Sequence, residues 1–210
     1  SEMCIRDRYY DGGSPTALWA VRSLGINPSD GRELFLTKEG TYTFEYDTED
    51  EVVVGNSEPK LEGVLGSTLY WKGFSFSLYF RYSLGADVFT EATYNKVENI
   101  SLAGLKSNQD KRALHDRWQK PGDHAKFKGI SLTETTPISS RFVLRENYIK
   151  AESISVGYDF ESQAVQKLGI QSLRLQANTT DLFRISSIKE ERGIEYPFAR
   201  SFSFSLSAMF

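Results

Sequence analysis

Hydrophobic and small polar residues alternate along the last stretch of the chain. Residues 200–210 read Arg-Ser-Phe-Ser-Phe-Ser-Leu-Ser-Ala-Met-Phe. Because successive side chains of a β-strand point to opposite faces, this order predicts a strand with one apolar face and one polar face. The apolar row consists of Phe202, Phe204, Leu206, Ala208 and Phe210. The stretch is also long enough for a tilted strand that crosses a bilayer, which needs about 9–11 residues.

A second alternating pattern, over residues 61–84, predicts a β-hairpin. Lys72 and Gly73 lie between its two runs, where a two-residue turn is expected. Directly opposed residues share a face, so this turn places the large apolar residues of both runs on one side. They are Leu65, Leu69, Trp71, Phe74, Phe76, Leu78, Phe80 and Tyr82. The other side is polar and carries Arg81, which we expect to face a barrel lumen.

Two further stretches, 148–160 and 172–178, alternate in the same way and predict two more strands. With the hairpin and the terminal stretch they make five strands, separated in turn by short and long connections. Outer-membrane barrels alternate short periplasmic turns with long extracellular loops. The sequence therefore predicts an all-β fold, a partial antiparallel transmembrane β-barrel with long extracellular loops.

The connections divide the chain. Residues 9–60 are expected to form an extracellular loop region with short hairpins, and residues 61–210 the C-terminal barrel strands and loops. The strand-like pieces of the first region are 17–21, 33–37, 42–46 and 52–54. A long irregular loop is expected at 85–145, with one short helix at 111–119. A brief helical turn is expected at 161–170 and a polar loop at 181–198.

Composition agrees with a barrel wall. The 210 residues include 14 Phe, 11 Tyr and 3 Trp, which suit strands and interfacial aromatic girdles. No apolar run approaches the roughly 18 residues of a transmembrane helix. The formal net charge of −3 provides no basic footprint, so nucleic acid is not expected as a partner.

The first eight residues are treated apart. Residues 1–8 contain charges but not the apolar core of a secretory signal, and they resemble translated sequencing-adapter sequence. We exclude them, with the single cysteine Cys4, from the fold. The expectation is that the chain is a fragment of a longer protein.

Catalytic chemistry is not expected. His115 and His124 are the only histidines and have no cysteine partner for a zinc site. No Gly-x-Ser-x-Gly elbow is present, and the loop carboxylates lack a spacing typical of a glycosidase pair. The acidic run at 47–51 lacks the ligand spacing of a calcium loop. We therefore expect no enzyme activity, no metal and no cofactor.

Some residues of the long loops are candidates for contact with a ligand or a partner protein, because aromatic rings stack on sugars and fill interfaces. They are Tyr94, Arg117, Trp118, Tyr196 and Phe198. The alternative is that they pack within the loops or belong to a girdle. Arg81, Arg174 and Tyr79 are expected on the lumen side, where ion pairs within the wall are favoured over substrate contact.

With these residues in place, the chain resembles the C-terminal portion of a SusC/RagA-family TonB-linked outer-membrane transporter. The resemblance rests on short motifs in family order across nearly the whole chain after the first fifteen residues. They are 24–28 with Gly31, 54–60, 70–74, 117–118, 139–143, 148–158, 168–170, 181–183, 196–197 with Arg200, and the terminal strand.

The resemblance implies a plugged barrel of about 22 strands, of which this chain holds about the last five. It implies import of glycan or peptide fragments across the outer membrane of a Gram-negative, Bacteroidetes-like bacterium. The expected partners are the TonB energy-transducing system, reached through the missing N-terminal part, a SusD-like surface lipoprotein and outer-membrane lipid. The terminal row ending at Phe210 is expected to be the signal that the barrel-assembly machinery recognises.

Two alternatives stay open at this point. One is a passive porin or an adhesin-type outer-membrane barrel, which would lack the plug and the TonB-contacting segment. The other is a soluble carbohydrate-binding β-sandwich, whose alternating strands would bury their apolar rows against a second sheet.

Overall fold

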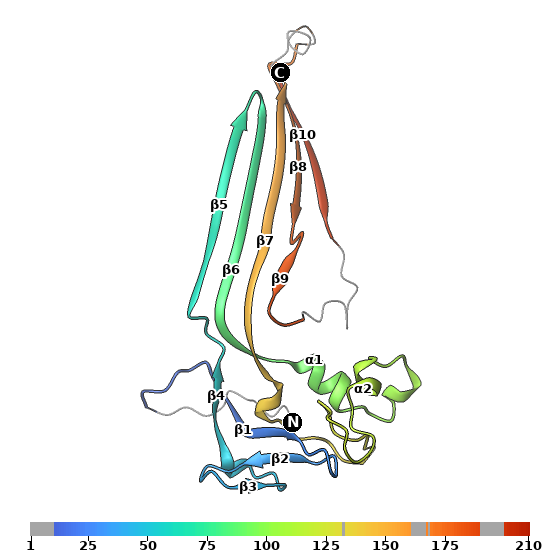
Figure 1. The fold of residues 1–210 in the computed structure, drawn as a ribbon. Coiled ribbons are helices and arrows are strands. Elements are labelled where there is room, and N and C mark those ends of the chain that lie inside the picture. Colours follow the sequence, from blue (N-terminus) through green and yellow to red (C-terminus); the bar gives the residue numbers. More distant parts are fainter. Residues whose placement is uncertain (1–10, 132, 161–166, 168, 190–199) are drawn as a thin grey trace. The chain divides into compact units, whose positions relative to one another are not determined.

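A computed structural model describes residues 11–131, 133–160, 167, 169–189 and 200–210. They divide into two compact units that are discontinuous in sequence (Figure 1). The first unit is drawn from Ser1–Glu58 and Ala86–Arg145, and the second from Pro59–Gly85 and Glu146–Phe210. Most of the helical turn expected at 161–170, and residues 190–198 of the loop expected at 181–198, lie outside the described residues.

The second unit is built on one sheet with the strand order β10-β8-β7-β6-β5, and β9 also pairs with β7. The strands are β5 (Leu61–Trp71), β6 (Phe74–Phe89), β7 (Val143–Phe160), β8 (Ser172–Thr180), β9 (Arg184–Ser186) and β10 (Phe202–Met209). The pairs β10–β8, β5–β6, β7–β8 and β7–β9 are antiparallel. The all-β prediction and its five strands are confirmed, whereas β9 lies in a stretch that was expected to be loop.

The register of the β5–β6 hairpin is the predicted one. Trp71 pairs with Phe74, and the pairing continues without a shift to Leu61 and Leu84. The two turn residues, Lys72 and Gly73, have φ angles of 47° and 84°. Positive φ at both central positions is the geometry of a type I′ turn, whose twist matches the twist of the flanking strands.

The other strands present their apolar rows on one common face. Val156 of β7 lies opposite Ala177 of β8, which lies opposite Phe204 of β10. The rings of Phe74 and Tyr158 lie 4.5 Å apart, so the hairpin turns its apolar row to the same side. The alternation seen in four separate stretches of sequence therefore becomes one continuous apolar surface.

The first unit contains a four-stranded sheet with the order β3-β2-β1-β4. Its strands are β1 (Ala17–Ile26), β2 (Glu33–Leu36), β3 (Tyr42–Thr43) and β4 (Glu51–Asn56). All four strand-like pieces predicted at 17–54 are thus strands, but β1 runs to Ile26. It continues past the predicted end because a bulge between Ser23 and Gly25, with Gly25 at φ 100°, keeps it paired with β2.

The stretch from residue 90 to 142 is a packed loop with several single helical turns. They are α1 (Glu91–Thr93), the π-helix η2 (Tyr94–Glu98), the 3-10 helix η3 (Gly104–Lys106), α2 (Arg112–His115) and the 3-10 helix η4 (Ser140–Phe142). The helix predicted at 111–119 is wrong in its extent. It ends at His115 because the next residues turn to pair with Phe127, to which the Trp118 N–H donates at 3.0 Å.

A small apolar core holds this loop together. Val97, Ala113, Phe127 and Phe142 are buried against one another, with Phe89, Tyr94 and Ile100 packed around them. In the described part of the chain, no helix has the length and apolar character needed to span a membrane.

The turn geometry makes Gly73→Ala a test of the hairpin. A Cβ at this position would lie 2.9 Å from the Asp159 carbonyl oxygen, at a φ that disfavours side chains. We expect a loss of about 1–3 kcal/mol in unfolding free energy, measured by denaturant titration of the purified protein. Lys72→Asn is the matched control, because Asn tolerates positive φ, and it should cause no loss.

Candidate functional site

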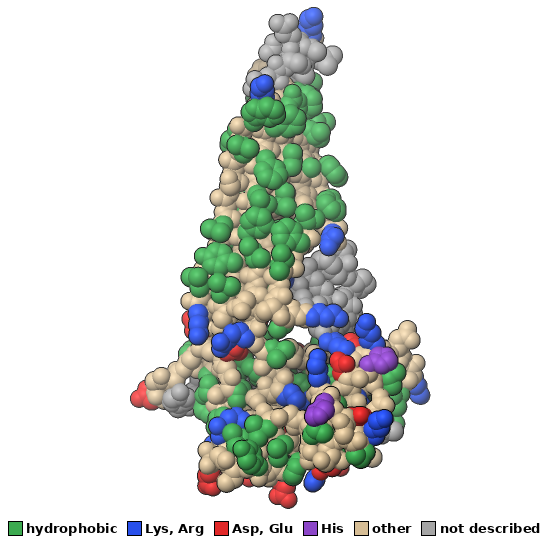
Figure 2. Space-filling model, viewed as in Figure 1, with side chains coloured by type: hydrophobic (Ala, Val, Ile, Leu, Met, Phe, Trp, Pro, Cys, Tyr) green, Lys and Arg blue, Asp and Glu red, His purple; other side chains and the backbone are tan. Residues whose placement is uncertain are grey.

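The apolar face of the second unit is largely exposed. Trp71 is 63% exposed, Phe204 76% and Phe210 79%. Figure 2 shows hydrophobic side chains gathered along the strands of this unit. Among the described residues of the unit, no second sheet covers this face. A contiguous exposed apolar surface of this kind marks an interface with a membrane or with another protein.

The predicted terminal row lies on this surface. The residues of the row that belong to β10 pair with β8 in one unbroken register, Phe202 opposite Thr179 and Ala208 opposite Leu173. All members of the row are exposed, and the serines between them take the other face. Recognition of this row by an assembly machinery stays a prediction.

Aromatic rings gather at the turn end of the hairpin. Tyr158 lies 4.5 Å from Phe74 and 4.7 Å from Phe160, measured between ring centroids. The ammonium group of Lys72 lies 5.3 Å from the Trp71 ring centroid. Rings with a polar or charged neighbour at one end of the strands are typical of a girdle at a membrane–water interface.

The opposite face of the sheet carries charges, and they are paired across strands. Arg81 of β6 binds both carboxylate oxygens of Glu152 of β7, at 2.8 and 3.0 Å. Arg174 of β8 lies 3.6 Å from Asp159 and donates to the Ser75 hydroxyl at 3.0 Å. The prediction of ion pairs within the wall for Arg81 and Arg174 is confirmed.

The register along β7 shifts by one residue where its partner changes from β9 to β8. Lys150 pairs with Arg184 of β9 and Ser153 pairs with Thr180 of β8, so three steps along β7 face four steps on the partner side. The extra residue therefore lies between the two partner strands, where Asp181 has a φ of 55°, and it forms a β-bulge there. Two further pairs lie on either side of this point, Arg184–Glu146 at 2.7 Å and Lys150–Asp181 at 3.8 Å.

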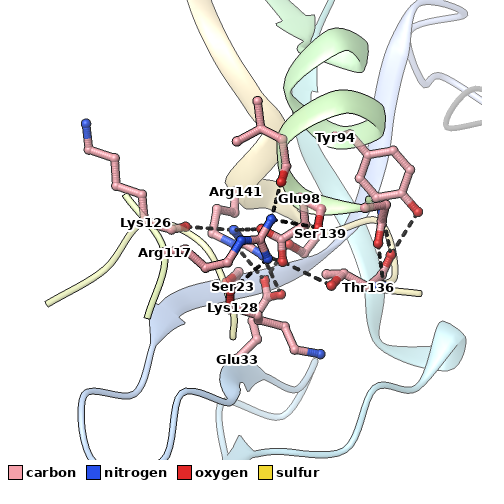
Figure 3. A network of polar contacts seen from close by, with 12 residues as sticks. Ser23, Glu33, Tyr94, Glu98, Arg117, Lys126, Lys128, Thr136, Ser139 and Arg141 are labelled. Atoms are coloured by element: carbon pink, nitrogen blue, oxygen red, sulfur yellow. Dashed lines mark hydrogen bonds and ion pairs between the residues drawn. The ribbon is translucent and has the colours of Figure 1, made fainter. Parts of the chain in front are cut away.

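The first unit contains a buried network of charges centred on Arg141 (Figure 3). The Arg141 guanidinium binds Glu33 of β2 at 2.9 Å and Glu98 of the π-helix at 3.2 Å. The side chains of these two glutamates are 2% and 0% exposed. The Ser139 hydroxyl donates to Glu33 at 2.6 Å and the Thr136 hydroxyl to Glu98 at 3.0 Å. Each buried carboxylate therefore has both a cation and a hydroxyl donor.

Burial and ion pairing shift the pKa of Arg141 in opposite directions. Burial lowers the pKa of its guanidinium, but hydrogen bonds to Glu33 and Glu98 more than compensate, so the pKa is raised. The pKa of Arg117, by contrast, is lowered by burial, although an arginine keeps its proton even so. The network holds two guanidinium groups and two carboxylates and is balanced in charge.

Arg117 is buried and binds only main-chain oxygens. Its guanidinium donates to the carbonyl of Ala113 at 3.0 Å, that of Lys128 at 2.8 Å and that of Glu98 at 3.0 Å, and also to the Val97 carbonyl. It is 5% exposed. The arginine satisfies carbonyl groups that the short π-helix and α2 leave without intrahelical partners. For this residue the alternative of packing within the loop fits the structure.

Trp118 and Tyr94 also make contacts within the first unit, Trp118 with the β1–β2 connection and Tyr94 within the long loop. The Trp118 indole N–H donates to the Pro28 carbonyl at 2.9 Å. Its ring packs against Gly31 so closely that a Cβ at Gly31 would lie 2.5 Å from the ring carbons. The Tyr94 hydroxyl donates to the Thr136 carbonyl at 2.8 Å. Both rings are half-buried. The other two candidates, Tyr196 and Phe198, lie outside the described residues.

No protein-family model matches the chain, but curated proteins resemble it in sequence. It is 24% identical over 161 residues to the TonB-dependent receptor P39 of Formosa agariphila, covering 75% of this chain and 15% of the relative. It is 25% identical over 173 residues to the TonB-dependent receptor P3 of the same organism, covering 82% and 16%.

Solved structures share the fold. The RagAB peptide importer in its open-open state superposes with a TM-score of 0.68 at 17% identity, covering 83% of this chain and 19% of that chain. A structure of the RagAB peptide transporter gives a TM-score of 0.67 at 15% identity, covering 82% and 19%. The chain is thus similar in sequence to curated TonB-dependent receptors and in fold to the RagAB peptide importer. It spans about a sixth of the length of the curated receptors it matches, 15% and 16%.

Sequence reasoning missed the charge network of the first unit. Glu33, Glu98 and Arg141 are far apart in the chain and belong to no local pattern. Arg141 stands in the stretch 139–143, which does not indicate its partners. The described ranges contain no group of three histidine, cysteine or acidic side chains that could hold a metal ion.

Removal of the central cation tests the network. Arg141→Ala leaves two buried carboxylates uncompensated, which should cost about 3–5 kcal/mol of local stability. Hydrogen-exchange mass spectrometry of receptor peptides covering residues 90–141 measures this as faster exchange. The matched control is Arg32→Ala, because the Arg32 side chain is 62% exposed and an ion pair at the surface, such as the one with Asp30, contributes little to stability. Equal exchange in the two variants would contradict a structural role of the network.

Proposed function

We propose that this chain forms five neighbouring strands of the plugged β-barrel of an outer-membrane TonB-dependent nutrient importer. One observation carries the proposal: five neighbouring strands share a continuous exposed apolar face, while their charged groups are paired on the other face. Lipid covers the apolar face in the intact receptor, and the charged face lines the interior of the barrel.

Energetics support this orientation. An arginine on the lipid face would cost about 2–4 kcal/mol at the bilayer midplane. Arg81 and Arg174 both lie on the polar face, where each has an acidic partner. Strands β6 and β7 contain 16 and 18 residues, more than the roughly 9–11 needed to cross a bilayer. They continue beyond the membrane into the long loops.

The alternation of connections supports the topology. The short turn at Lys72-Gly73 and the connection from β7 to β8 lie on the periplasmic side, and the segment between β6 and β7 is extracellular. The complete barrel contains about 22 strands and a plug, supplied by parts of the receptor outside this chain. The organism is a Gram-negative, Bacteroidetes-like bacterium, in line with the Formosa relatives.

The imported substrate is a glycan or peptide oligomer, and TonB drives its import through the plug. Support comes from the curated relatives named as TonB-dependent receptors and from the RagAB peptide importer as a structural neighbour. A SusD-like surface lipoprotein covers the extracellular side and meets the long loops of this chain.

Uptake in whole cells tests the function. Cells that carry the complete receptor should take up their oligomer, and deletion of TonB should abolish that uptake. A passive porin would keep transporting without TonB, and an adhesin would show no uptake in either strain. Recovery of this chain as a soluble monomer in detergent-free buffer would instead support a β-sandwich.

The assignment of the lipid face predicts the effect of a charge on β10. Phe204→Arg places a charge on the apolar face and should strongly reduce the amount of receptor assembled in the outer membrane. Ser203→Arg, one residue away on the polar face, should have a much milder effect. The readout is the folded, heat-modifiable receptor band in isolated outer membranes, and equal losses would contradict the face assignment.

A further inference from the structure

An open cavity of about 380 Å³ lies in the loop of the first unit, between α2 and Phe127. Its lining is almost wholly polar, and the charged or titratable groups used here are His115, Asp116, Lys120, Asp123, His124 and Lys126. On the face drawn in Figure 2, histidine side chains lie beside lysine or arginine side chains. These residues lie outside the apolar face of the second unit, and Lys126 meets the buried charge network through its main-chain carbonyl.

The walls of the cavity are held in place by that network. Arg117, which lines the cavity, is anchored to main-chain carbonyls by its guanidinium. On the other wall, Arg141 donates to the Lys126 carbonyl at 2.8 Å. The Lys126 N–H donates across to the Asp116 carbonyl at 3.0 Å. A site built on such a fixed frame binds without a large ordering cost.

The polar groups of the cavity differ in whether they already have hydrogen-bond or ion-pair partners. The Asp123 carboxylate accepts two backbone N–H groups, from Gln119 at 3.2 Å and Lys120 at 3.0 Å, and so closes its own turn. The side chains of Lys120 and Lys126 make no hydrogen bond or ion pair within the described part of the chain. The same is true of the two imidazoles, and all four side chains belong to exposed residues.

The balance of unengaged groups favours an acceptor-rich ligand. Two ammonium groups offer three donors each, and each imidazole offers at least one. The two lysines and the two acids balance in formal charge, but Asp123 already accepts two backbone N–H groups, so hydrogen-bond donors outnumber the acceptors that remain unengaged. A metal ion does not fit, because no group of three metal-ligating side chains occurs among the described residues.

We propose that this cavity binds an oxyanion group, such as a carboxylate or a sulfate, carried by the oligomer that the receptor imports. The inference deepens the proposed import function, since it names the charge class of the ligand on the extracellular loop. Lys120 and Lys126 supply the compensating charge, and His115 and His124 supply further N–H donors. Charge-assisted hydrogen bonds of this kind are stronger than neutral ones.

Protection of lysines from acylation tests the site in the purified full-length receptor in detergent micelles. Mass spectrometry follows the acetylation rate of each lysine with inorganic sulfate, oligogalacturonate or poly-aspartate added, against sodium chloride at matched ionic strength. Lys120 and Lys126 should react several-fold more slowly with an oxyanion present. Lys106 and Lys111, which are exposed and lie outside the cavity, serve as internal controls and should not change.

The outcomes separate the sources of the oxyanion. Protection by oligogalacturonate alone assigns a saccharide ligand, protection by poly-aspartate alone assigns a peptide, and protection by both or by sulfate assigns the oxyanion itself. The double variant Lys120→Gln, Lys126→Gln should weaken the binding of the protecting probe by about tenfold or more, and Lys106→Gln should not. Equal protection of all four lysines, or of none, overturns the proposal. The assay contains no TonB and measures binding alone. A negative result here therefore counts against the binding site and not against the proposed import function.

Discussion

Antiparallel hydrogen bonding in one register is the constraint on which the second unit depends. Side chains of a strand alternate with a period of two, so a slip of one residue would move every apolar side chain to the charged face. The type I′ turn at Lys72-Gly73 sets the register of the hairpin, and the unbroken pairing of β8 with β10 carries it to the terminal strand. The register along β7 shifts once, by an extra residue between its partners β9 and β8, and the apolar row from β7 to β10 stays in register beyond that point.

The first unit depends on a different interaction. Its loop is too irregular to be held by strand pairing alone, and its apolar core is small. Arg141 joins β2 to the π-helix through two buried carboxylates, and Arg117 binds the carbonyls that short helices leave open. Replacement of one partner in such a cluster is costly because the remaining charge stays buried. A long loop gains a fixed shape in this way, which is what a polar cavity needs in order to select a ligand.

The two units also differ in how far local sequence could predict them. The apolar rows, the hairpin register and the all-β class follow from alternation and turn chemistry, which act over neighbouring residues. Strand ends were harder to place: β1 runs to Ile26 through a bulge at Gly25, and the helix near residue 112 stops after one turn. In both cases pairing with a distant segment outweighs the local preference. The roles of Arg117 and Trp118 also depend on distant partners, the π-helix and the Pro28 carbonyl.

The sequence by itself determined which residues share a face, because a period of two needs no knowledge of distant contacts. It also determined that the terminal row Phe202, Phe204, Leu206, Ala208 and Phe210 belongs to one apolar surface. Only the tertiary structure decided that Glu33, Glu98 and Arg141 meet, since more than a hundred positions separate the first from the last. It likewise decided that Lys120 and Lys126 line one cavity, where their ammonium groups are unengaged hydrogen-bond donors. Side-chain partners of charged residues depend on which segments the fold brings together, and no local pattern encodes that choice.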